Sequence, residues 1–228
     1  MSTAWSYSSI KTFDQCPRKY FHLKVLKDVK DSGSDATIYG QEVHKAAEDY
    51  VKDGTPIPEK FAYVRGVVDT IKRMEGHKYT ELKLGVSKTE EGYAPCKFLG
   101  KDVWWRGIAD VVVIRGDVAY SLDYKTSKNA KYADTKQLDL VAAGLFVHFP
   151  HLKKVKSGLL FVVSNEFIKK DHYVEQKDAY FDTFKTELDR LDTAEVSGVW
   201  NAVTGPLCKF CPVTRCEHNN KSERKYHG

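Results

Sequence analysis

The 228-residue chain has no long hydrophobic run. Its longest uncharged apolar stretches, such as residues 159–164, fall far short of the roughly 20 residues that a membrane-spanning helix needs. The first four residues lack the basic and apolar regions of a signal peptide, and the sequence contains no internal repeat, low-complexity tract or obvious linker. We therefore expect a cytoplasmic protein without a membrane partner, folded as a single domain over residues 1–228.

The chain also lacks the even number of cysteines that a closed disulfide framework needs, because it has five. Three of them, Cys208, Cys211 and Cys216, lie within nine residues of each other. In a chain without a signal peptide, such crowding favours ligation of a metal ion or a cluster over disulfide bonds.

Neither sign of charge dominates, since 36 lysines and arginines oppose 31 acidic residues and give a net charge of +5. This balance permits an anionic partner without requiring one. In the first 30 residues, basic residues such as Arg18 and Lys19 alternate with aromatic ones such as Tyr20 and Phe21. Such a segment can bind phosphates and stack on bases, or it can be a solvated helix face over core aromatics. The residues alone leave both interpretations open.

Apolar periodicity divides the chain into three parts. Residues 1–76 predict helices, the clearest of which begins near Thr37 and buries positions three or four residues apart. Residues 77–175 predict a series of short strands, interrupted by one helix capped near Asp134. A last helix, over about residues 178–191, lies in the final part, residues 176–228. This order of elements predicts an α/β core with added helices.

Two apolar strands flank Gly116-Asp117, and this hairpin is the most informative segment. Glycine in the first turn position suits a type II′ turn, and the resulting register places Asp110 opposite Asp123. Their Cβ atoms would lie about 5 Å apart, so their repulsion would favour a divalent cation that also activates water. Lys125 falls on the same strand face as Asp123 and could neutralise charge on a phosphate. An ordinary surface hairpin with ion pairs is the alternative.

Two helical residues add to these candidates. His44 lies beside the buried stripe of its helix, and Gln137 borders the apolar stripe of the helix that begins near Asp134. Taken alone, a helical histidine is most often structural or exposed, and such a glutamine would be a surface amide.

The motifs, in their order along the chain, resemble those of the RecB-like nucleases of the PD-(D/E)XK superfamily, including CRISPR-associated and AddB-type members with iron-sulfur clusters. Residues 6–21 are similar to the family's opening signature, and residues 40–44, Gly-Gln-Glu-Val-His, to its G-x-x-x-H motif. Residues 107–110 resemble its second motif, and residues 123–125, Asp-Tyr-Lys, its D/E-x-K motif. Gln137 resembles the beginning of a Q-x-x-x-Y motif in which Val141 replaces the tyrosine.

The resemblance implies a restriction-endonuclease-like α/β fold, in which helices flank a mixed central sheet, with N-terminal helices and a C-terminal cluster-binding segment. It also implies a site for Mg2+ or Mn2+, and a histidine ligand tilts the preference toward Mn2+ because imidazole is softer than carboxylate. The implied metal ligands are His44, Asp110, Asp123 and the backbone carbonyl of Tyr124. The implied catalytic residues are Asp110, Asp123, Lys125 and Gln137.

The activity that the resemblance implies is that of a metal-dependent DNA nuclease. Cluster-bearing relatives suggest an exonuclease that prefers single strands and acts in DNA repair or recombination. The opening signature supplies Arg18, Lys19 and Tyr20 as expected DNA contacts. Because the sequence has no Walker A loop, any unwinding would need a helicase or another recombination partner.

The cysteine-rich segment resembles the carboxy-terminal cysteine triplet of the cluster-bearing members. With Cys16 of the opening signature as the fourth ligand, Cys208, Cys211 and Cys216 are expected to bind a 4Fe-4S cluster, with Zn2+ as the less favoured occupant. Cys96 matches no motif and is predicted to be a small core residue. Two other classes stay open: a non-cleaving nucleic-acid-binding subunit, or a zinc-binding subunit, of a recombination or replication complex.

Overall fold

The computed structural model describes residues 4–131 and 133–219. The chain forms two compact units: unit 1 comprises Met1–Gly33 and Phe184–Gly228, and unit 2 comprises Ser34–Thr183. Whether both units act together as one nuclease domain stays a prediction. Among the described residues, every helix is too short or too polar to cross a membrane.

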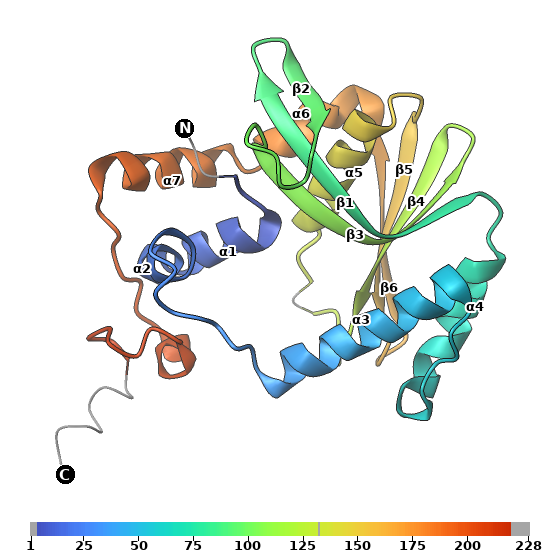
Figure 1. Ribbon diagram of the computed structural model, residues 1–228, viewed down its shortest axis with the longest axis horizontal. Helices are drawn as coiled ribbons and strands as arrows, with labels where there is room; N and C mark the ends of the chain where they lie inside the picture. Colours follow the sequence, from blue (N-terminus) through green and yellow to red (C-terminus); the bar gives the residue numbers. More distant parts are fainter. Residues whose placement is uncertain (1–3, 132, 220–228) are drawn as a thin grey trace. The chain divides into compact units, whose positions relative to one another are not determined.

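Unit 2 is built on a six-stranded mixed sheet with the strand order β2-β1-β3-β4-β5-β6 (Figure 1). The strands are β1 (His77–Thr89), β2 (Gly92–Cys96), β3 (Trp105–Arg115), β4 (Val118–Lys125), β5 (Lys154–Phe161) and β6 (Glu166–Tyr173). Only β4 and β5 pair in parallel, and helix α5 (Lys136–His148) makes the crossover that a parallel pair requires. The predicted fold class, a mixed sheet flanked by helices, is confirmed.

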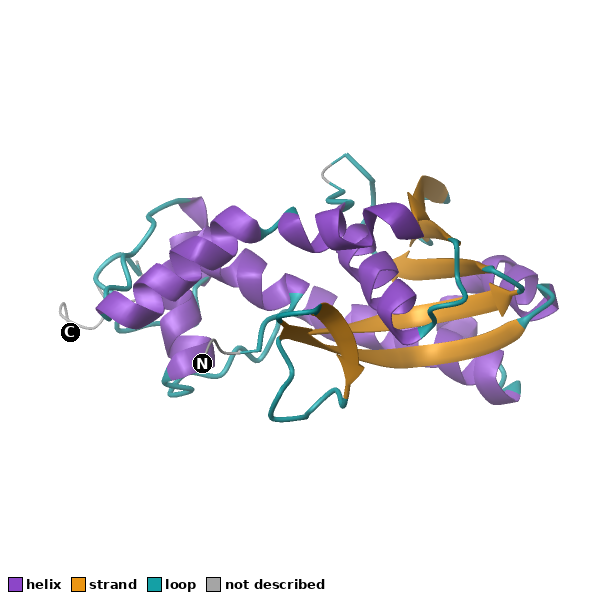
Figure 2. Ribbon diagram, turned by 90° about the horizontal axis from the view of Figure 1, so that it is seen from above, coloured by secondary structure: helices purple, strands orange, loops and turns teal. Residues whose placement is uncertain are grey.

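Helices pack on both faces of this sheet (Figure 2). On one face, α3 (Asp35–Asp53), a 3-10 turn (Glu59–Val64) and α4 (Arg65–Arg73) share an apolar core with β3, which contributes Val111 and Val113. On the other face, α5 packs so closely that a Cβ atom at Gly144 would lie 2.6 Å from the ring of Trp105. The 3-10 turn Val174–Gln176 and the short helix α6 (Lys177–Asp182) follow β6, and Phe181 of α6 packs edge-on against Trp105.

Partway along β3, the odd-numbered side chains switch from one face of the sheet to the other. Trp105 packs against α5, whereas Val111 and Val113 face α3 and α4, although all three positions are odd and a regular strand would place them on one face. The paired strand β1 is irregular at the same level, because Glu81 adopts a left-handed conformation with φ 49°. Glu81 lies opposite Asp110 in the register of these two strands, between the pairs Thr80 with Val111 and Leu82 with Ala109.

A buried polar cluster connects α5 with the last two strands. Asp139 accepts a hydrogen bond from His172 Nε2 at 2.8 Å and forms an ion pair with Lys170 at 2.6 Å. The other ring nitrogen of His172 lies 3.1 Å from the hydroxyl of Ser157. Asp139 is 5% exposed and His172 is fully buried, so this Ser-His-Asp group is closed to any substrate and anchors the first turn of α5.

Unit 1 combines segments from both sides of unit 2 in the sequence. It contains α1 (Tyr7–Gln15), α2 (Pro17–Tyr20), a π-helical turn (Phe21–Val25), α7 (Lys185–Ser197) and a 3-10 turn (Pro206–Phe210). Its core is aromatic: Phe13 packs edge-on against Tyr20, and Trp200 stacks on both Tyr20 and Phe21. The final helix predicted over about residues 178–191 is in fact two helices, since α6 ends before α7 begins.

Candidate active site

The predicted hairpin of β3 and β4 is confirmed, and its opening forms the site. The ladder runs from Arg115 with Val118 to Val111 with Leu122, which is the predicted register. It ends just before Asp110 and Asp123. There the backbone N–H of Tyr124 donates a 2.9 Å hydrogen bond to Asp110 Oδ2 in place of a further strand pair. The two carboxylates therefore lie where the strands separate.

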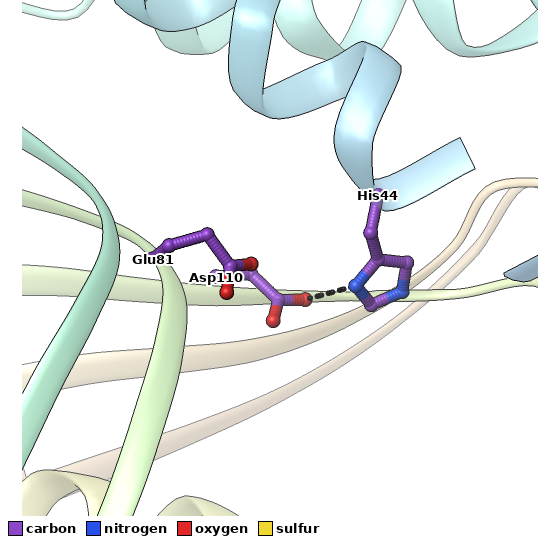
Figure 3. Close-up of side chains that lie close together, drawn as sticks. All are labelled: His44, Glu81 and Asp110. Atoms are coloured by element: carbon purple, nitrogen blue, oxygen red, sulfur yellow. Dashed lines mark ion pairs between the residues drawn. The ribbon is translucent and has the colours of Figure 1, made fainter. Parts of the chain in front are cut away.

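Helix α3 brings His44 to this opening. His44 Nδ1 lies 3.2 Å from Asp110 Oδ2, and the ligand atoms of His44, Glu81 and Asp110 all lie within 4.8 Å of one another. Figure 3 shows the three side chains pointing toward one another, with the dashed line between His44 and Asp110. An imidazole nitrogen with carboxylate oxygens is a donor set that fits a first-row divalent cation.

Glu81 was missed by the sequence analysis. Its strand β1 is separated from β3 by β2 and a long loop, so no tight turn fixes the register that puts Glu81 opposite Asp110. The left-handed backbone at Glu81 is also invisible in a sequence, because glutamate seldom adopts it. The only hint in the sequence was that an acidic residue stands at this position of the predicted strand.

On the other side of Asp123, three side chains form a closed triangle. Lys125 Nζ lies 2.7 Å from Asp123 Oδ2 and donates a 3.1 Å hydrogen bond to Gln137 Oε1. Gln137 Nε2 in turn donates a 2.6 Å hydrogen bond to Asp123 Oδ1. The first turn of α5 thus holds both the carboxylate and the ammonium group in place.

The electrostatics of this site favour an added positive charge. Burial, followed by the negative charge of Asp110, raises the pKa of Asp123 to about 6, although Lys125 and His44 act in the opposite direction. Burial and the charge of Asp110 also raise the pKa of Glu81. Burial lowers the pKa of His44, but the Asp110 and Asp123 carboxylates and the backbone of Tyr124 together outweigh it, and the net shift is upward.

A cavity of about 500 Å³ lies beside these residues. His44, Glu81, Asp110 and Ile108 line it, together with the first half of α3. A Cβ atom at Gly40 of α3 would lie 3.2 Å from the hydroxyl of Thr126, so glycine permits the close approach of α3 to the end of β4. A ligand in this cavity has direct access to the three candidate metal ligands.

In unit 1, four cysteines line one small cavity: Cys16, Cys208, Cys211 and Cys216. Backbone N–H groups donate to two of the sulfurs, from Val203 to Cys16 at 3.5 Å and from Gly205 to Cys208 at 3.4 Å. Cys96 ends β2 in unit 2, where burial raises its pKa. It is partly exposed, and so it is less deeply buried than the predicted core position.

The three residues of unit 1 that were expected to contact DNA, Arg18, Lys19 and Tyr20, have different surroundings. Arg18 Nη1 donates to Glu217 Oε2 at 2.6 Å. Tyr20 is 1% exposed and packs among aromatic rings, so its own ring is closed to a base. Lys19 is half-buried beside the cysteine cavity.

The chain belongs to the PD-(D/E)XK nuclease superfamily, whose family model matches residues 4–216. No curated protein matches the chain. Among solved structures, it is similar to a candidate exonuclease from Eubacterium rectale, with a TM-score of 0.53 and 13% identity over 99% of this chain and 93% of that one. It is also similar to SSO0001, with a TM-score of 0.48 and 13% identity over 96% of this chain and 88% of that one.

Proposed function

We propose that the protein is a metal-dependent DNA nuclease of the RecB-like branch and that it acts as an exonuclease on single strands. The observation that carries this proposal is the meeting of His44, Glu81 and Asp110 beside the triangle of Asp123, Lys125 and Gln137, in a chain of a nuclease superfamily. The similar structure described as a candidate exonuclease agrees with an exonuclease but tests only the fold.

The residues divide the work between binding and charge stabilisation. His44, Asp110, Asp123 and the carbonyl of Tyr124 would hold Mg2+ or Mn2+, with Glu81 as an additional ligand. When bound, such an ion activates water and polarises the phosphate.

Lys125 stabilises charge in this mechanism, and Gln137 positions Lys125. The ammonium group of Lys125 can donate to a phosphate oxygen and offset the charge that develops during attack. Gln137 restricts where Lys125 can lie, because the same amide binds Asp123.

We also propose that Cys16, Cys208, Cys211 and Cys216 bind a 4Fe-4S cluster. The support for a bound group at these cysteines is that all four line one cavity. Unwinding of a duplex would fall to a separate helicase.

The decisive experiment is a cleavage assay with end-labelled single strands and duplexes in Mn2+, in Mg2+ and in EDTA. Asp110→Asn and Lys125→Met should each lower the rate at least a thousandfold. Asp117→Asn is the matched control, because Asp117 is a carboxylate in the turn of the same hairpin and its side chain is 54% exposed. Cleavage that persists in EDTA or in Asp110→Asn would refute the proposed activity.

A further inference from the structure

On the face of the sheet away from α5, a strip of β1 and β3 continues from the cavity of the active site. Beyond Glu81, Lys83 pairs with Ile108 and Gly85 pairs with Arg106 across β1 and β3. Because the neighbouring residues of this segment pack against α5, these side chains lie on the opposite face. Ile108 also lines the cavity of the active site and is 42% exposed. The strip is therefore continuous with the candidate metal ligands.

Two cations on this strip share one aromatic ring. Lys83 Nζ lies 6.0 Å and Arg106 Cζ lies 5.9 Å from the centre of the Phe98 ring. Within residues 4–131 and 133–219, neither cation has a carboxylate partner, whereas many other lysines of unit 2 do. Two unpaired positive charges around one ring repel each other, and an anion placed between them would relieve that repulsion.

The spacing along the strands relates these cations to the reacting phosphate. At about 3.4 Å per strand residue, Lys83 lies about 7 Å from Glu81 and Arg106 about 14 Å from Asp110 along the strands. A stacked DNA strand advances about 3.4 Å per nucleotide, so these distances correspond to roughly two and four nucleotides from the cut. Regularly spaced cations beside an aromatic ring are the chemistry that binds a single strand.

We propose that one unpaired DNA strand lies along this strip, with Lys83 and Arg106 binding phosphates and Phe98 stacking on a base. Stacking on Phe98 requires a base that is not paired, so the substrate next to the cut is a single strand. This inference rests on the proposed function, because the metal ligands define where the cut phosphate lies.

Binding of a fluorescent twelve-nucleotide thymidine oligomer to the full chain in EDTA tests the strip without cleavage. The double variant Lys83→Gln with Arg106→Gln should bind at least tenfold more weakly, and its salt slope should decrease by about 1.4, at about 0.7 per phosphate contact. Phe98→Leu should weaken binding about fivefold or more with an unchanged slope. Lys169→Gln is the matched control, because Lys169 lies 4.9 Å from the ring of Phe167 on β6.

Hydrolysis of bis(4-nitrophenyl) phosphate in Mn2+ separates the strip from the site, because this small diester cannot span both. The double variant should retain the wild-type rate on it while kcat/KM for DNA falls at least tenfold. Unchanged DNA affinity and slope, an equal loss on the small diester, or equally tight binding of a blunt duplex would overturn the proposal. A wild-type chain that cuts nothing but loses DNA affinity in the double variant would refute the proposed nuclease and support the strip.

Discussion

Replacing Asp123 with asparagine should stabilise the metal-free protein at pH 8 while it removes metal-dependent cleavage. The side chain of Asp123 is only 23% exposed, and burial with the nearby Asp110 raises its pKa to about 6. In an unfolded chain the carboxyl has its ordinary pKa, about 3.9. The folded protein must therefore ionise this group under less favourable conditions than the unfolded chain does.

The sign and the size of this change in stability follow from the coupling of proton binding to folding. Between about pH 4 and pH 6 the folded state holds a proton that the unfolded state has released, so stability falls as the pH rises through this window. A difference of about two pKa units corresponds to about 3 kcal/mol, an upper value because part of the side chain stays in water. For a chain of this size, that is a gain of roughly 6–12 °C in melting temperature for Asp123→Asn at pH 8.

Calorimetric melting in EDTA at pH 4 and pH 8 measures this effect. The asparagine variant should gain stability at pH 8 and little at pH 4, and Mn2+ should stabilise the wild type more than the variant. Asp117→Asn, in the turn of the same hairpin, should show no such pH dependence. A variant that is no more stable than the wild type at pH 8, or equally stabilised at both pH values, would refute the reasoning.

Four further substitutions probe separate contacts. Gln137→Ala should lower kcat more than tenfold with DNA affinity unchanged, since Lys125 loses its amide partner; an unaltered kcat in steady-state kinetics would argue against this role. Glu81→Gln should weaken Mn2+ binding about tenfold by titration calorimetry, and equal affinities would exclude Glu81 as a ligand. Cys208→Ser should lose iron and brown colour and melt earlier, whereas stoichiometric zinc in anaerobically purified wild type would contradict the cluster. Asp139→Asn should cost about 2–3 kcal/mol in urea unfolding, because it leaves His172 and a lysine without their buried partner; a loss below 1 kcal/mol would disprove this anchor.

The sequence could predict those parts of the site that depend on short-range geometry. The two-residue turn at Gly116 fixes the register of β3 and β4, and the ladder keeps the predicted register up to the residues next to Asp110 and Asp123. A direct pairing of these two carboxylates stays a prediction. Lys125 follows from the period of the same strand. These relations need no knowledge of how distant segments pack.

Other features depend on distant packing and were not predictable. Glu81 reaches the site through a register that no tight turn sets and through a left-handed backbone. The burial of Tyr20 requires Trp200, which stacks on it from the other end of unit 1 in the sequence. An aromatic residue among basic ones can bind a base or fill a core, and only its tertiary neighbours decide which.

The discontinuous sequence of unit 1 has a consequence for synthesis on the ribosome. Its two segments meet over a long separation, as in the pair of Arg18 with Glu217, which lie 199 positions apart. The first segment must wait for all of unit 2 to be translated, about 8 to 30 s at roughly 5–20 residues per second. Unit 2 is continuous and can fold during that interval. Meanwhile Trp5, Phe13 and Tyr20 have no completed core to enter, so the nascent chain exposes an aromatic segment that chaperones can bind until the carboxy-terminal segment emerges.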